Sequence, residues 1–185
     1  MLKKKNEKGA ITIEFAILFS VFFVILYAII AYSIPFMLTL SLRHTAAEAA
    51  HAAIKVDPYL DKKTYLEKVS QQVTGTVNGT LEGSKTWLPS SWRSGDCDRP
   101  EANLGWIKIP GSPSFGWVSY NELNNINTPR HQIYICLQRK YNKNGASGET
   151  AIIPYLNLLG FEVPSLPKNS NGDTVLKGEA YTTHL

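Results

Sequence analysis

The 185-residue sequence lacks the short motifs that mark common catalytic and nucleotide-binding sites. It contains no Gly-x-Ser-x-Gly, no His-Glu-x-x-His, no P-loop and no dinucleotide-binding fingerprint. The four histidines are scattered, and none has a partner at motif spacing. His44, Glu48 and His51 have no further ligand within reach in the sequence, so we interpret them as a solvated polar face. The sequence therefore predicts no enzyme, no metal site, no cofactor and no small-molecule substrate.

An excess of positive charge is confined to the N-terminus, although the pI of the whole chain is about 9.0. From His44 to Leu185 the chain has 14 Lys and Arg residues against 13 Asp and Glu residues. Most of the surplus comes from four residues near the start, which are Lys3, Lys4, Lys5 and Lys8. The rest of the chain has almost no net positive charge, so we expect no nucleic-acid partner.

Cysteine is scarce as well, because Cys97 and Cys136 are the only two in the chain. Their wide spacing contains no Cys-x-x-Cys, which gives little support to a redox-active or zinc site. An even pair in a segment that should reach an oxidising compartment favours one structural disulfide. Two unrelated buried thiols are the alternative.

A single apolar run dominates what the sequence does contain: the 28 residues from Phe15 to Leu42 carry no charge. A helix needs about 20 apolar residues to cross a bilayer, so this run can span one and continue as a stem. Lysines before a membrane helix stay on the cytoplasmic side, which places the residues after Leu42 outside the inner membrane. A cleavable signal peptide is the alternative, but its apolar region is usually only about 7–15 residues long. Pro35 predicts a kink or local melting near Ala31, or else a break between stem and domain.

Glu14 is a carboxylate one step inside this apolar stretch, where an ionisable group costs a few kcal/mol unless it finds a partner. The surrounding sequence resembles the class III signal of type IV pilins, with a short basic leader, a glycine before the scissile bond and a glutamate as fifth mature residue. This resemblance implies that a prepilin peptidase cuts between Gly9 and Ala10. It also implies that Glu14 pairs with the new amino group of a neighbouring subunit during assembly.

Two further stretches, Gly9 to Ala16 and the alanine-rich Arg43 to Ala53, resemble the TadE-like minor pilins of tight-adherence (Flp) pilus systems. The resemblance covers residues 1 to about 55, and beyond them only the layout agrees. It implies a pilin-like (pseudopilin) structural or assembly subunit that supports pilus biogenesis and surface adherence. The partners would be the membrane, a prepilin peptidase, other pilin-like subunits and pilus assembly proteins. The protein would cross the bacterial inner membrane once, with the N-terminus cytoplasmic and the C-terminal domain periplasmic or extracellular.

The chain as a whole predicts an α+β protein in three parts: a basic leader (1–9), a transmembrane helix and stem (10–55) and an extracytoplasmic α+β domain (56–185). Asp61 suits the N-cap of a second helix, whose apolar stripe would be Leu66, Val69, Val73 and Val77. A small antiparallel sheet with long irregular loops should follow.

The clearest strand is expected at residues 131–138, with Ile133, Ile135 and Leu137 on one face and Cys136 on the other. Further strands are expected at 117–120 and 174–182. Residues 152–166 could form a short helix or lie against the membrane.

All four tryptophans fall between residues 83 and 117, where frequent Gly and Pro predict irregular structure. These residues are Trp87, Trp92, Trp106 and Trp117. Exposed, they would suit a surface that binds a glycan or a protein; buried, they would cap a small core. A membrane-anchored extracytoplasmic binding module is therefore the alternative function, and it need not lose its nine leader residues.

Overall fold

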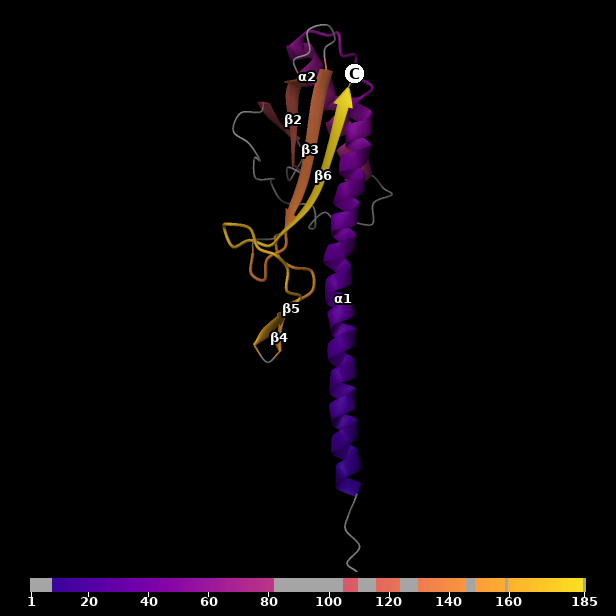
Figure 1. Cartoon of the computed structure of the whole chain (residues 1–185), viewed down its shortest axis with the longest axis vertical. Coiled ribbons are helices and arrows are strands. Elements are labelled where there is room, and N and C mark those ends of the chain that lie inside the picture. Colours follow the sequence, from indigo (N-terminus) through magenta and orange to yellow (C-terminus); the bar gives the residue numbers. More distant parts are fainter. Residues whose placement is uncertain are drawn as a thin grey trace, which may run out of the picture.

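The computed structural model describes residues 8–81, 105–109, 116–123, 130–145, 149–158 and 160–184. Two helices are followed by six strands: α1 (Lys8–Ala53), α2 (Lys62–Leu81), β1 (Gly105–Ile109), β2 (Gly116–Leu123), β3 (Arg130–Lys140), β4 (Leu156–Leu158), β5 (Phe161–Val163) and β6 (Val175–His184). Figure 1 shows α1 as a long rod, with the domain packed beside its C-terminal half and its N-terminal half projecting. The predicted α+β class is confirmed.

The main sheet has four antiparallel strands in the order β1-β2-β3-β6. β6 pairs with β3 although the separate β4–β5 hairpin lies between them in the sequence. The predicted strands at 117–120, 131–138 and 174–182 are confirmed, and all three are longer than expected. The expectation of irregular structure from 83 to 117 is wrong at β1, a short alternating segment that pairs with β2. For residues 152–166 the sequence left a short helix or a segment against the membrane open, and the described part of this stretch contains the β4–β5 hairpin and no helix.

The core lies between the sheet and the C-terminal half of α1. Ile133, Ile135 and Leu137 are fully buried on one face of β3, as their alternation predicted. Facing them, α1 contributes Leu38, Leu42 and four alanines, Ala46, Ala49, Ala50 and Ala53. Small side chains let a helix backbone approach its neighbours closely, so the alanine-rich stretch serves to seat the stem on the sheet.

The closest approach of stem and sheet occurs at Gly178 in β6. A Cβ atom at Gly178 would lie 2.5 Å from the backbone nitrogen of Arg43, and closer still to the carbonyl group of Leu42. No side chain fits there, which explains why glycine interrupts this strand. Gly178 therefore sets how near β6 can lie to α1.

The second helix begins at the predicted cap. Asp61 Oδ2 accepts a hydrogen bond from the backbone N–H of Thr64 at 3.1 Å. Hydrogen bonding to the side chain of Thr64, and then to its backbone, lowers the pKa of the Asp61 carboxyl. The buried stripe of α2 is Tyr65, Val69, Val73, Val77 and Leu81. Three of the four predicted residues are confirmed, while Leu66 is only partly buried because Tyr65 takes the inward position. α2 packs against α1 and against strands β1 and β2.

Two of the alternatives predicted for Pro35, local melting near Ala31 and a break between stem and domain, are wrong, because α1 is continuous from Lys8 to Ala53. The predicted kink stays a prediction. Proline removes one backbone hydrogen bond and clashes with the preceding turn, but packing can hold a helix together around it. Pro35 is buried against the domain, and the hydroxyl of Thr39 donates to the Pro35 carbonyl at 2.8 Å. The stem and the apolar segment are therefore one element.

Candidate membrane stem and assembly surface

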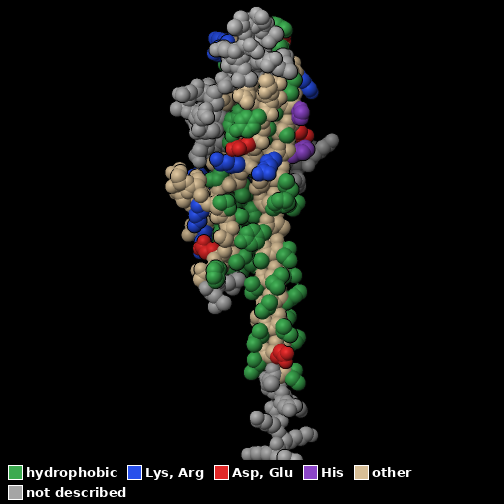
Figure 2. Space-filling model, viewed as in Figure 1, with side chains coloured by type: hydrophobic (Ala, Val, Ile, Leu, Met, Phe, Trp, Pro, Cys, Tyr) green, Lys and Arg blue, Asp and Glu red, His purple; other side chains and the backbone are tan. Residues whose placement is uncertain are grey.

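The projecting half of α1 carries large apolar side chains on every side. From Ile11 to Ile30 nearly all residues are exposed, and Glu14 is the only Asp, Glu, Lys or Arg among them. In the described part of the chain α1 is the one helix that is long and apolar enough to cross a membrane. Figure 2 shows hydrophobic side chains along this half, whereas charged side chains gather mainly on the domain. Length and composition thus favour a single-pass membrane anchor.

Two serine hydroxyl groups of α1 are satisfied within the helix. Ser20 Oγ donates to the carbonyl of Ala16 at 2.7 Å, and Ser33 Oγ donates to the carbonyl of Ile30 at 2.8 Å. The hydrocarbon core of a bilayer contains no water to hydrogen-bond a hydroxyl group. A hydroxyl that donates to a carbonyl of its own helix needs no such partner. Both hydroxyls are therefore compatible with lipid around the helix.

Glu14 lies near the start of α1, far from the domain. It is exposed, and no side chain in the described ranges is paired with it. Leu38, in the core, follows 24 residues later, a distance of about 36 Å along a helix. Even the hydrogen bond between Tyr27 and Pro154 lies 13 residues, or about 20 Å, further along the helix, so the described part of the domain supplies no partner for this carboxylate. A charged partner would come from the helix end itself or from another molecule.

The predicted cleavage site lies in the first described turn of α1. Lys8 is its first residue, and Gly9 and Ala10 lie in its first turn. Lys3, Lys4 and Lys5 lie outside the described residues. The roles predicted for the leader lysines, for Gly9 and Ala10 and for Glu14 remain predictions.

The amino-acid sequence of this same region matches a family model described as TadE-like protein, over residues 9–51. Residues 9–51 are TadE-like. The TadE-like segment begins at the predicted cleavage site, includes Glu14 and ends two residues before the end of α1. The predicted resemblance is thus confirmed for the stem, and the match leaves the sheet domain uncovered. No curated protein and no solved structure shows significant similarity to the chain.

The predicted tryptophan surface is only partly within the described residues. Trp117 in β2 is half-buried and packs against Tyr134 and Cys136, with Lys108 Nζ 5.7 Å from the centre of its ring. Trp106 lies in β1, and Trp87 and Trp92 fall outside the described residues. Trp117 therefore covers the outer face of the sheet, which is the role of a structural aromatic.

Cys136 points to the face of β3 opposite Ile135, as the alternation predicted, and it is almost fully buried. Cys97 lies outside the described residues, so the pairing of the two cysteines remains a prediction.

The histidines of the TadE-like segment lie on an exposed face. His44 and His51 are both exposed, and His44 Nδ1 lies 3.8 Å from Glu48 Oε1. Among the described residues no group of three His, Cys, Asp or Glu side chains could hold a metal ion. The arrangement agrees with the interpretation as a solvated polar face.

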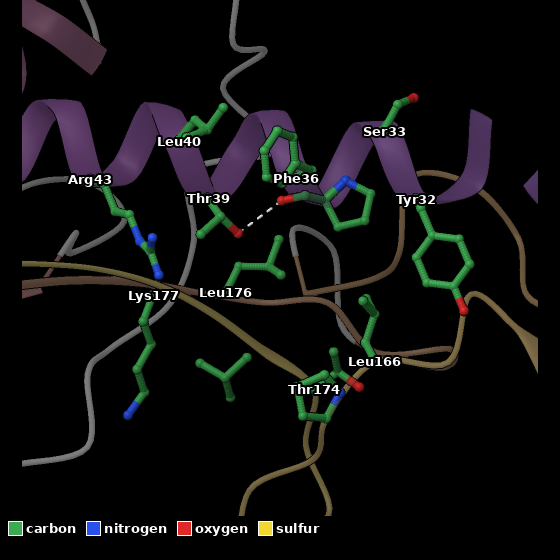
Figure 3. A pocket seen from close by; sticks show the side chains of 13 residues that line it. Tyr32, Ser33, Phe36, Thr39, Leu40, Arg43, Leu166, Thr174, Leu176 and Lys177 are labelled. Carbon is green, nitrogen blue, oxygen red and sulfur yellow. Dashed lines mark hydrogen bonds between the residues drawn. The ribbon is translucent and has the colours of Figure 1, made fainter. Parts of the chain in front are cut away.

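A groove that sequence reasoning missed lies where α1 leaves the domain, with a volume of about 710 Å³. It is lined by Tyr32, Ser33, Pro35, Phe36, Thr39, Leu40 and Arg43 of α1 and by Leu166, Pro167, Thr174, Val175, Leu176 and Lys177. Figure 3 shows Arg43 and Lys177 at one end and Tyr32 at the other. Its walls are mostly apolar, and the two cations favour negative charge at one end. The groove joins residues more than 120 positions apart in the sequence. The only related signal in the sequence is that the helical turns after Tyr32 are apolar.

Proposed function

We propose that this protein is a pilin-like structural or assembly subunit of a tight-adherence type IV pilus system, supporting pilus biogenesis and surface adherence. The observation that carries the proposal is the exposed apolar half of α1 within the TadE-like segment, interrupted only by Glu14. So much apolar surface is stable only when lipid or other apolar helices cover it. A subunit that passes from a membrane into an assembly needs a helix that suits both surroundings.

The proposed maturation uses the N-terminal signal. A prepilin peptidase cuts between Gly9 and Ala10, which removes the basic leader with Lys3, Lys4, Lys5 and Lys8. Before cleavage these lysines hold the N-terminus in the cytoplasm, so the domain faces the periplasm or the cell exterior. The proposal is supported by the start of the TadE-like match at Gly9.

In this proposal Glu14 is the assembly residue. Its carboxylate pairs with the amino group that cleavage creates at Ala10 of a neighbouring subunit. Removing one member of a charge pair in a low-dielectric environment costs about 3–5 kcal/mol, because the other charge stays buried and unpaired. That loss is large enough to depopulate a contact between subunits.

The test is Glu14→Gln, which removes the charge and keeps the size and hydrogen-bonding capacity of the side chain. Glu67→Gln, at an exposed position of α2, is the matched control because it makes the same chemical change outside the stem. We expect both variants to reach the membrane at normal abundance. Only Glu14→Gln should lose crosslinking to pilus components and pilus-dependent adherence. Unchanged crosslinking and adherence in that variant would refute the assembly role and favour an anchored binding module.

A further inference from the structure

The β4–β5 hairpin extends beyond the main sheet toward the N-terminal half of α1, beside the part of α1 that leaves the domain (Figure 1). Its two strands pair only with each other, through Leu156 with Val163, Asn157 with Glu162 and Leu158 with Phe161. Gly160, in the turn, has a φ of 90°, a backbone conformation that glycine adopts without strain. The hairpin is thus a separate projection of the domain on the side of the apolar helix.

Two hydrogen bonds hold this projection against α1. The hydroxyl of Tyr27 donates to the carbonyl oxygen of Pro154, just before β4. The backbone N–H of Ser165, just after β5, donates to the hydroxyl oxygen of Tyr32 at 2.9 Å. Both flanks of the hairpin are therefore fixed to the helix, and its height along α1 is set by the two tyrosines.

That height falls within the thickness of a bilayer. Tyr27 follows Ile11 by 16 residues, a rise of about 24 Å at 1.5 Å per residue. The hydrocarbon core of a bilayer is about 30 Å thick. With Ile11 at the cytoplasmic edge, the contact between Tyr27 and Pro154 lies within about 6 Å of the outer edge of the hydrocarbon. A hairpin that starts at this contact lies at the boundary between acyl chains and headgroups, where water still reaches its unpaired strand edges.

The side chains of the hairpin fit that surrounding. Phe161 is 76% exposed and Leu156 is 40% exposed. Outside α1, Phe161 is the only exposed phenylalanine in the described part of the chain. Exposed apolar side chains on one face of a projecting hairpin are characteristic of a contact with lipid or protein.

The one acidic residue of the hairpin is neutralised. Glu162 accepts a hydrogen bond from Lys143 Nζ at 3.0 Å, and this interaction lowers the pKa of the carboxyl. Lys168, also exposed, lies near the same carboxylate and adds positive charge above the hairpin. Lys140, Lys143 and Lys168 are balanced by Glu149, Glu162 and Asp173, so the polar layer beside the hairpin has no net charge. The exposed apolar side chains and this layer of paired charges together match the acyl chains and the headgroups of a membrane surface.

We infer that the hairpin is a second membrane contact, in which Phe161 and Leu156 enter the outer leaflet of the bilayer that α1 spans. The inference rests on the proposed function only in that α1 must cross a membrane. The occupant of this surface is bilayer lipid, with acyl chains at the tip and headgroups at Lys143 and Lys168. The domain would then contact the membrane through both α1 and the β4–β5 hairpin. Two contacts would fix the tilt of the domain relative to the bilayer.

The test is depth-dependent fluorescence quenching of the full chain in vesicles of phosphatidylethanolamine and phosphatidylglycerol with brominated acyl chains. Three variants each receive one fluorophore on an introduced cysteine: Phe161→Cys, Leu18→Cys in the middle of the apolar half, and Tyr59→Cys. Tyr59 is 79% exposed after the far end of α1 and serves as the control in water. The wild-type chain, labelled in parallel, supplies the background from Cys97 and Cys136. We expect the brominated lipid to quench the label at 161 to at least half the extent seen at 18, and to leave 59 unquenched.

Quenching at 18 with none at 161 above the level at 59 would overturn the inference and leave the membrane span intact. Shielding of 161 from a water-soluble quencher without quenching by lipid would also overturn it, because a protein would then cover the hairpin. Absence of quenching at 18 would refute the membrane span, and with it the proposed function. Thermal unfolding at the wild-type temperature would show that the label at 161 has not disturbed the fold.

Discussion

Replacing Gly178 by alanine tests the packing of the stem on the sheet with the smallest possible change. The added methyl group would overlap the backbone of Leu42 and Arg43, with 2.5 Å to the Arg43 nitrogen. A backbone cannot turn aside as a flexible side chain can, so β6 and α1 would have to separate. Overpacking of this kind costs about 1–3 kcal/mol, and the contact with backbone places Gly178→Ala near the upper end. For a chain of this size each kcal/mol lowers the melting temperature by about 2–4 °C.

The assay is thermal unfolding of the full chain in detergent micelles, followed by the far-ultraviolet circular dichroism of the domain. Gly75→Ala is the matched control, because a Cβ atom there has nothing within 4 Å. Alanine is favoured over glycine inside a helix by about 0.5–1 kcal/mol, so Gly75→Ala should raise the melting temperature slightly. Equal melting temperatures for Gly178→Ala and the wild-type protein would refute the described contact between α1 and β6.

Three further predictions concern maturation, the disulfide and pH. In cells that contain the peptidase, N-terminal sequencing should find Ala10 as the first residue, and an intact leader ending in Gly9 would contradict the pilin-like proposal. Thiol labelling of the unfolded, unreduced protein should find Cys97 and Cys136 unreactive, since a disulfide closing a loop of about 40 residues stabilises by roughly 3–4 kcal/mol; two reactive thiols would be the contrary result. Burial raises the pKa of Tyr65 to about 12 from its ordinary value of 10.0, so its stabilisation is complete below pH 10 and is lost as the pH rises through about 12. Denaturant unfolding at alkaline pH should show a smaller loss of stability in Tyr65→Phe, and an identical pH dependence would contradict the assignment.

The parts of the fold that rest on local patterns could be predicted from the sequence. The uncharged run gave the stem, Asp61 gave the start of α2, and the alternation from Ile133 to Leu137 gave β3 with the correct inward face. Each of these signals lies within one segment of chain, so a single sequence is enough to read it. Local melting or a break at Pro35 was predicted wrongly, because the packing of the domain against α1 is a tertiary effect.

The surfaces that join distant segments could not be predicted. The groove needs Phe36 of α1 to meet Leu176 of β6, and no local pattern connects them. The β4–β5 hairpin was ambiguous because its strands are only three residues long and flanked by proline. Its attachment to Tyr27 joins residues 127 positions apart. For the candidate assembly site, the sequence supplied Glu14, and the structure added the distance that separates it from the domain.

The continuity of α1 through Pro35 has a consequence for the direction in which the domain faces. Each residue of a helix turns the chain by about 100° and advances it by about 1.5 Å. The number of residues between Glu14 and Leu38 therefore fixes the azimuth of the sheet relative to the carboxylate, as well as its height. Subunits held together at Glu14, as proposed, would present their sheets at one angle set by this count. An insertion of two residues would turn the sheet to nearly the opposite side, whereas an insertion of seven would restore its direction to within about 20°.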